Sequence, residues 1–393
     1  MKKLILIVVM FVIATFFIIE DKNNINSYVN NNINDNNVKA IYFSYIELEK
    51  YIKDKPIDTI KENINTIINN ISSSGFNLLI LHVRPFSDSI YPSNIFLPSK
   101  SVTSGNTLSF DILKYFLEVS HSYNISVHAW INPYRISSDN NYVITSNHPA
   151  YSFVGTNHIK VLDNGVYYNP ASEKVNSLIV SGIEEIVTNY DVDGIHFDDY
   201  FYPSDDIDLE NYNEYKALGG KLSIEEYRYK NVSKMLSLVY SSIKKIDDSV
   251  LFGIAPQGNI ENNYSTEYLD IKSILSSNGY IDYVMPQIYF GFHNSSKPFS
   301  NTYDEWAGLI KVDSIRLIPA LALYKSGSSD KYAGSGINEW IDNSDILKRQ
   351  ILYMKSKSSY SGFSIFRYEH FYNSSNDNMK KEVYNIKEIL LRK

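Results

Sequence analysis

The feature that most constrains the fold is an unbroken alternation of short apolar segments with longer segments of helical periodicity. From Val38 onward, eight apolar segments are each followed by a segment whose apolar residues recur at helical spacing. We predict strands at residues 38–46, 77–83, 125–131, 192–198, 249–255, 281–289, 314–322 and 362–368. Such alternation is typical of parallel sheets with helical crossovers.

Eight strand–helix units are the number that closes into a barrel. The alternative, an open doubly wound sheet, usually carries a glycine-rich phosphate loop after its first strand, and no such loop follows residues 38–46. We therefore predict an α/β fold in which residues 38–393 form a single (β/α)₈ TIM barrel with long strand-to-helix loops.

The N-terminus predicts export from the cell. Two lysines precede an apolar run from Leu4 to Ile19, which is the layout of an export signal. We expect residues 1–20 to be a signal peptide or membrane anchor and the Asn-rich residues 21–37 to be a linker. The expected location is outside the cytoplasmic membrane, secreted or anchored, with membrane contact only through this segment.

Composition excludes several classes of function. The chain has no cysteine, which rules out thiol catalysis, disulfides and thiolate zinc sites. Its net charge of -7 argues against a nucleic-acid partner, since such proteins usually carry a basic patch. We expect no cofactor and no metal.

Loop lengths place the functional site at one end of the barrel. Connections from helix to strand are short, whereas those from strand to helix are long, and the one after the third strand covers residues 132–171. Barrel enzymes build their active sites from the loops that follow the strands.

The fourth predicted strand ends in an acidic and aromatic cluster, "DVDGIHFDDYFYP". Because alternate side chains of a strand face the same way, His196 and Asp198 should point into the barrel. Cleavage of a glycosidic bond needs a proton donor and a charge that stabilises an oxocarbenium-like transition state. We predict Asp198 and Asp199 as the catalytic pair, although either acid could instead act with Glu47, Asp88 or Glu369.

The other strand ends bring polar and aromatic groups to the same rim, as a carbohydrate site requires. The predicted substrate-binding residues are Arg84, Asp88, Tyr91, Trp130, Asn132, Tyr134, Arg135, His196, Tyr200, Gln257, Gln287 and Tyr289. A plain structural interpretation stays open for several of them. Each of the histidines at positions 82, 128 and 196 is better explained by core packing than by catalysis, although their occurrence on three neighbouring strands favours a shared role. Arg84 is equally consistent with an internal ion pair to Asp198 or Asp88.

Seven motifs occur in the order expected of one family. They are "LHVRPFSDSIYPS", "HAWINPYR", "YYNPASEKV", "VDGIHFDDYFYP", "YRYKNV", "GIAPQGN" and "DYVMPQIYFGF". Together they resemble the glycosyl hydrolase-like 10 family. The resemblance implies a TIM-type barrel, export to the bacterial envelope and action on glycans such as peptidoglycan.

The chain also resembles chitinase-like barrels more distantly, but it departs from their motif. Those proteins carry D-x-x-D-x-D-x-E on the fourth strand, and the matching positions here are Asp193, His196, Asp198 and Tyr200. The glutamate that acts as the acid is replaced by tyrosine, which disfavours a chitinase-type mechanism and moves the expected proton donor to Asp199 or to another strand.

The sequence thus predicts an exported glycoside-cleaving enzyme, hydrolytic or lytic, acting on an envelope polysaccharide such as peptidoglycan. A glycan-binding barrel without turnover is the first alternative, supported by the missing glutamate. A metal-dependent hydrolase using His82, His128, His196 and Asp198 is the second.

Overall fold

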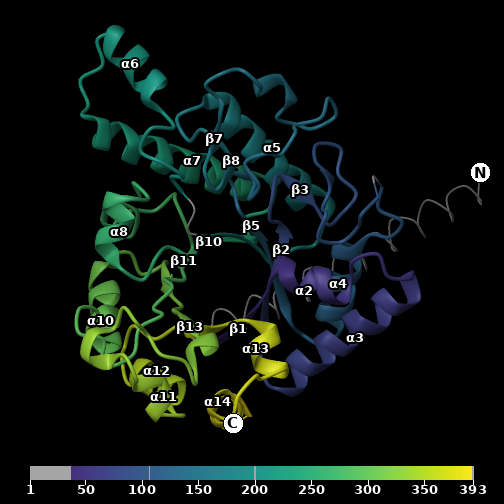
Figure 1. Cartoon of the computed structure of the whole chain (residues 1–393), viewed down its shortest axis with the longest axis vertical. Coiled ribbons are helices and arrows are strands. Elements are labelled where there is room, and N and C mark those ends of the chain that lie inside the picture. Colours follow the sequence, from purple (N-terminus) through teal and green to yellow (C-terminus); the bar gives the residue numbers. More distant parts are fainter. Residues whose placement is uncertain (1–36, 106, 199–200, 392–393) are drawn as a thin grey trace, which may run out of the picture.

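The computed structural model describes residues 37–391 except residues 106 and 199–200, and it confirms the predicted barrel (Figure 1). The signal or anchor segment and most of the predicted linker lie outside the described residues. The parallel strands are β1 (Val38–Phe43), β2 (Leu78–Arg84), β5 (Ser126–Ile131), β9 (Gly194–Phe197), β10 (Leu251–Ile254), β11 (Tyr283–Val284), β12 (Arg316–Leu317), β13 (Ala320–Ala322) and β14 (Gly362–Phe366).

Strands β12 and β13 are the two halves of the predicted seventh strand, and together they close the ring. β12 pairs with β11, and β13 pairs with β14. Between the halves, Ile318 N donates to Val284 O at 2.9 Å, while Ser364 N donates to Pro319 O at 2.9 Å. The strand is divided at Pro319 because proline has no N–H to donate to a ladder. Eight strand positions therefore form a closed barrel.

Helices surround the barrel as predicted (Figure 1). They are α3 (Ile57–Ser73), α4 (Ile112–Ser122), α5 (Glu173–Asn189), α7 (Ile224–Ile246), α10 (Phe299–Leu309), α12 (Ile346–Lys355) and α14 (Asp377–Leu391). α3 buries Ile60, Ile64, Ile67 and Ile71 at helical spacing. α7 begins at Ser223, which forms a capping box with Glu226.

Two helices that apolar periodicity in the sequence predicts, at about residues 265–277 and 338–356, are wrong in their extent. Residues 265–277 do not form one helix; they are replaced by α8 (Ile260–Ser265) and α9 (Ile271–Ile274). Asn259 and Asp270 cap these two turns through their side chains, so each turn begins at its own cap. The helix predicted at residues 338–356 is likewise divided into α11 (Glu339–Asp342) and α12.

The long strand-to-helix connections carry extra elements on one face of the barrel (Figure 1). These are α2 (Tyr45–Tyr51), the short strands β3 (Asp88–Ser89) and β4 (Leu97–Pro98), the antiparallel sheet of β6 (Arg135–Ser137), β7 (Ile159–Leu162) and β8 (Gly165–Tyr168), α6 (Leu209–Ala217) and α13 (Tyr368–Tyr372). Across the described part of the chain, no helix combines the length and apolar character needed to cross a membrane.

The barrel interior is filled largely by rings. Tyr42, Trp130 and Tyr283 belong to one buried cluster together with aliphatic side chains and Met285. Tyr283 lies across β10 at Gly253, where a Cβ atom would stand 2.1 Å from the ring. Glycine is therefore required at position 253 to admit the tyrosine.

We expect Gly253→Ala to destabilise the fold by about 2 kcal/mol, because the added methyl group overpacks a filled core. Urea unfolding measures the change. Gly308→Ala is the matched control, since its methyl group meets no atom within 4 Å on α10 and alanine favours a helix. Equal stability of the two variants would contradict the assigned role of Gly253.

Candidate active site

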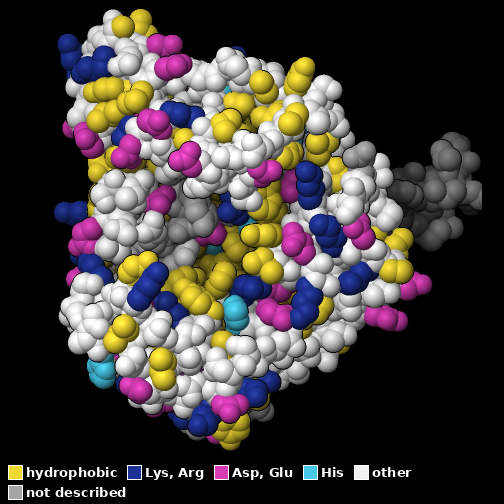
Figure 2. All heavy atoms as spheres, in the orientation of Figure 1, with side chains coloured by type: hydrophobic (Ala, Val, Ile, Leu, Met, Phe, Trp, Pro, Cys, Tyr) yellow, Lys and Arg dark blue, Asp and Glu magenta, His cyan; other side chains and the backbone are white. Residues whose placement is uncertain are grey.

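A cavity of about 280 Å³ opens at the C-terminal ends of the barrel strands. In the space-filling view, hydrophobic side chains gather around a hollow at the centre of this face (Figure 2). The lining residues are Tyr42, Ser44, Tyr45, Ile46, His82, Trp130, Arg135, Asp198, Gln287, Tyr289, Tyr324 and Phe366. Five predicted site residues are among them: Trp130, Arg135, Asp198, Gln287 and Tyr289.

Asp198 follows directly after β9 and faces the cavity. The strand alternates as predicted: Ile195 and Phe197 pack in the outer core, whereas His196 is buried inside the barrel. Gln287 Nε2 donates to Asp198 Oδ1 at 2.9 Å and lies 3.2 Å from Ala255 O. These contacts orient the carboxylate on the cavity wall.

Aromatic rings form most of the remaining wall. Tyr42 meets Trp130 and Phe366 edge to face, with ring centroids 5.2 and 5.6 Å apart. His82 stacks on Trp130 at 3.7 Å with an angle of 11° between the rings. Burial lowers the pKa of His82 well below its usual value, so at neutral pH this histidine is an uncharged ring.

His128 and His196 lie in the core below the cavity. Both Nδ1 atoms contact the Tyr283 hydroxyl, at 2.8 and 2.9 Å, and His196 Nε2 contacts the Tyr42 hydroxyl at 3.0 Å. Burial lowers the pKa of His128 to about 3 and that of His196 well below its usual value. His196 therefore supports Tyr42 from beneath and is not part of the cavity lining.

Arg84 lies outside the barrel interior, although residues two apart in a strand, such as His82 and Arg84, ordinarily share a face. A register shift between His82 and Arg84 interrupts the pairing of β2 with β5, and a bulge of this kind turns the next side chain. The guanidinium packs over Phe96 at 4.3 Å and against Gly182 of α5.

Four further predicted residues are not among those that line the central cavity. Tyr91 and Tyr134 are fully buried in the outer core. Asn132 is buried as well. Asp88 lines a separate cavity, where burial raises its pKa to about 6.

The other acids proposed as partners of Asp198 are engaged elsewhere. Glu47 is 1% exposed, pairs with Arg367 and accepts hydrogen bonds from Ser44 N and Oγ within a capping box. Glu369 pairs with Lys50 at 2.6 Å. Asp199 and Tyr200 lie outside the described residues, so their predicted roles stay predictions.

Glu267 is a carboxyl group near Asp198 that the sequence interpretation missed. It lies between α8 and α9 and is 8% exposed. Its Oε2 accepts hydrogen bonds from Phe201 N and Tyr202 N at 3.1 and 3.4 Å, and its Oε1 accepts one from Gln257 Nε2 at 2.7 Å. The predicted residue Gln257 therefore holds Glu267.

Burial, with a smaller contribution from the charge of Asp198, raises the pKa of Glu267 to about 7. Glu267 accepts hydrogen bonds from two consecutive backbone N–H groups, and these bonds fix the chain just beyond Asp198. No sequence motif marks this glutamate; only its position in the connection after β10, at the C-terminal rim, could have indicated it.

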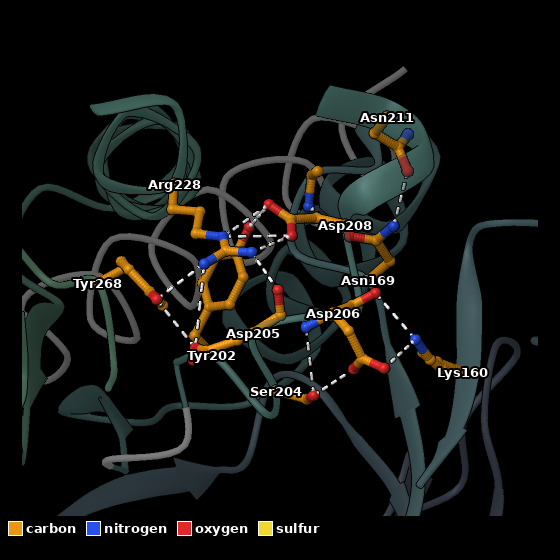
Figure 3. A network of polar contacts seen from close by, with 11 residues as sticks. Lys160, Asn169, Tyr202, Ser204, Asp205, Asp206, Asp208, Asn211, Arg228 and Tyr268 are labelled. Carbon is orange, nitrogen blue, oxygen red and sulfur yellow. Dashed lines mark hydrogen bonds and ion pairs between the residues drawn. The ribbon is translucent and has the colours of Figure 1, made fainter. Parts of the chain in front are cut away.

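A second network holds the same loop from the outside (Figure 3). Arg228 of α7 is 3% exposed and pairs with the fully buried Asp208 at 2.9 Å. Its Nη1 donates to the Tyr268 hydroxyl at 2.7 Å, and Tyr202 donates to Asp208 Oδ2 at 2.6 Å. Buried charges of this kind need their partners, so the loop is fixed at residues 202–208.

The metal-dependent alternative lacks a ligand set in the described residues. Within them, no group of three or more His, Asp or Glu side chains has the geometry to hold a metal ion. The three histidines instead contact aromatic rings and tyrosine hydroxyls, so they do not form the cluster that this hypothesis requires.

A closed (β/α)₈ barrel with a carboxylate in an aromatic cavity at its C-terminal face is the architecture of a glycoside hydrolase-type protein. The chain belongs to the glycosyl hydrolase-like 10 family, whose sequence model matches residues 34–335. This membership confirms the resemblance of the seven motifs and supports a glycan-acting enzyme.

Two named relatives are similar to most of the chain. Glycosyl hydrolase YngK of Bacillus subtilis is 28% identical over 325 residues, which are 77% of this chain and 63% of YngK. The chain thus spans less than two thirds of the length of YngK. Glycosyl hydrolase DigH of Escherichia coli is 28% identical over 328 residues, which are 76% of this chain and 74% of DigH.

Solved structures share the fold at low identity. The PgaB (BpsB) glycoside hydrolase domain from Bordetella bronchiseptica has a TM-score of 0.59 at 11% identity, covering 91% of this chain and 100% of that domain. The endo-1,4-beta-mannanase from Rhizomucor miehei has a TM-score of 0.56 at 11% identity, covering 91% and 95%. These similarities establish the barrel architecture.

We expect Glu267→Gln to weaken the fall in stability between pH 4.5 and 7. The folded-state pKa of about 7 lies above the ordinary value of 4.5, so the protonated carboxyl favours the folded state at low pH, and that contribution is lost as the pH rises to 7. In wild type the free energy of unfolding should therefore fall by an amount on the order of 1–3 kcal/mol over this pH range because of Glu267. The variant should lack this decrease, and urea unfolding across the same range measures it.

Glu382→Gln is the matched control, because burial also raises the pKa of Glu382 to about 7 on α14, where it accepts a hydrogen bond from Leu347 N. Both variants should flatten the pH dependence. Only Glu267→Gln should speed amide hydrogen exchange at Phe201 and Tyr202. Unchanged exchange at those two amides would contradict the positioning role of Glu267.

Proposed function

We propose that the protein is an exported enzyme that cleaves glycosidic bonds in a bacterial envelope polysaccharide, with the glycan strand of peptidoglycan as its substrate. The observation that carries the proposal is the placement of Asp198 at the end of β9, facing a cavity walled by aromatic rings. Membership of the glycosyl hydrolase-like 10 family supports the same class of reaction.

Asp198 is proposed to stabilise the positive charge that develops at the anomeric carbon, or to attack that carbon as a nucleophile. Its contact with Gln287 holds one carboxylate oxygen in place. Preorganised charge of this kind is an effective way to lower the barrier, since no reorientation is needed during the reaction. The proposal covers hydrolytic and lytic cleavage alike.

Asp199 is the proposed proton donor for the leaving oxygen, because it follows Asp198 directly in the chain. Glu267 has a pKa of about 7, which suits a general acid. Its oxygens, however, are hydrogen-bonded to two backbone N–H groups and to Gln257. We therefore assign Glu267 to positioning of the residues that follow Asp198.

The cavity wall suits sugar rings. Pyranose rings present C–H faces that pack on aromatic side chains, while their hydroxyl groups need hydrogen-bonding partners. Trp130 and Tyr289 provide aromatic surface, and Arg135 and Gln287 provide donors beside Asp198. The predicted export signal at residues 1–20 would bring such an enzyme to the cell wall.

We expect Asp198→Asn to lower the rate of cleavage of purified peptidoglycan glycan strands at least about a hundredfold, the scale of losing a charge-stabilising or acid–base group. Product analysis by mass spectrometry, scoring new reducing ends and anhydro-sugars, measures the effect. Asp313→Asn is the matched control, because Asp313 is exposed and remote from the cavity; it should retain full activity.

The tyrosine at position 200, where chitinase-like barrels have their acid, keeps a glycan-binding protein without turnover as the second candidate. If wild-type protein binds the strands but releases no products from peptidoglycan or from chitin oligomers, this second candidate replaces the enzyme. Near wild-type cleavage by Asp198→Asn would instead remove Asp198 from the mechanism.

A further inference from the structure

A second cavity of about 610 Å³ lies beside the central one on the same face of the barrel. We name it the side cavity. Two strand-to-helix connections and one residue of α2 line it. Its lining includes Phe86, Asp88, Lys100, Ser138, Tyr142 and Thr145.

The two cavities share a wall. Tyr45 and Arg135 line the central cavity, whereas Phe86 lines the side cavity. Phe86 contacts both of these residues of the central cavity. Its ring meets Tyr45 edge to face, with ring centroids 5.2 Å apart, and lies 4.6 Å from the Arg135 guanidinium. A chain that leaves the central cavity over these side chains enters the side cavity.

We propose that the side cavity binds further sugar residues of the same glycan chain whose bond is cleaved beside Asp198. This inference rests on the proposed function and deepens it, because it makes the substrate an extended strand and not a short oligosaccharide.

The first argument is size. Small-molecule sites usually enclose roughly 300–1,000 Å³, and the central cavity of about 280 Å³ lies just below this range. It has room for a short stretch of sugar around the cleaved bond. The side cavity offers about twice that volume next to it, so the combined site fits a polymer better than a monomer.

The second argument is chemistry. Tyr142 presents a partly exposed ring with the Lys100 ammonium group 5.1 Å from its centroid, and Phe86 supplies a second ring. Ser138 and Thr145 add exposed hydroxyl groups to the lining. Aromatic surface interleaved with neutral hydrogen-bonding groups is the composition that sugar rings require.

Asp88 adds a buried acceptor to this cavity. It is 8% exposed, and Phe86 N donates to its Oδ1 at 3.0 Å. Burial raises its pKa to about 6, and at neutral pH the mostly ionised carboxylate can accept hydrogen bonds from sugar hydroxyls.

The side cavity has rigid borders. β3 pairs with β4 beneath it, and β6 pairs with β8, which in turn pairs with β7. These strands are additions to the basic strand–helix repeat. They give the cavity a fixed shape, which reduces the entropy lost when a glycan binds.

The test compares chain lengths. The full-length protein is given unmodified glycan strands of alternating N-acetylglucosamine and N-acetylmuramic acid, as tetrasaccharide and as octasaccharide. We expect wild type to prefer the octasaccharide in kcat/KM. Tyr142→Ala should lower kcat/KM for the octasaccharide about tenfold, the scale of losing one aromatic contact, and leave the tetrasaccharide within about twofold.

Three further variants test whether the effect of Tyr142→Ala comes from lost glycan binding or from a change in folding. Tyr142→Phe keeps the ring and should keep the preference. Ser138→Trp blocks the cavity from an exposed position and should act like Tyr142→Ala. Tyr332→Ala is the matched control, since Tyr332 is 79% exposed, also has a lysine near its ring and lines neither cavity; it should change neither substrate.

The outcomes separate this inference from the proposed function. Cleavage of both lengths at equal kcat/KM, unaffected by Tyr142→Ala and Ser138→Trp, would overturn the inference and leave the function standing. Absence of any cleavage would overturn the function. In that case calorimetry decides: tighter octasaccharide binding that depends on Tyr142 supports the side cavity, and length-independent binding or none overturns it.

Discussion

The site depends on how the barrel interior is filled. A closed ring of eight parallel strands has a core that side chains must occupy at close-packed density. Here Tyr283 fills the middle, in the space left by Gly253, and its hydroxyl contacts the Nδ1 atoms of His128 and His196. His196 in turn supports Tyr42, whose ring meets Trp130. The floor of the cavity is aromatic because Tyr42 and Trp130 belong both to this buried layer and to the cavity lining.

That layer also decides which histidines can take part in chemistry. Burial without an acidic partner disfavours the charged imidazole, and the pKa values of all three interior histidines are lowered accordingly. They therefore act as neutral rings and hydrogen-bonding partners at physiological pH. The proposed acid–base chemistry is therefore assigned to carboxyl groups and not to these histidines.

Much of this arrangement could be predicted from the sequence, because it follows from periodicity. The alternation of side chains along the fourth strand predicted that Asp198 faces the cavity and Phe197 the outer core. The lengths of the loops predicted the end of the barrel at which the cavity lies. The errors have local causes. The shift after His82 turned Arg84 toward α5, and a bulge leaves no mark in a run of apolar residues. Glu267 was missed because its importance comes from contacts with a loop 65 and 66 residues away in sequence.

The acidic side chains at this face of the barrel differ in the groups that they contact. Glu47 is neutralised by Arg367, and Asp208 by Arg228. Glu267 binds backbone N–H groups of this loop, and burial raises its pKa to about 7. The loop that follows Asp198 is thus held by Glu267 on one side and by Arg228 on the other, so contacts from two neighbouring elements support the chain just beyond this carboxylate.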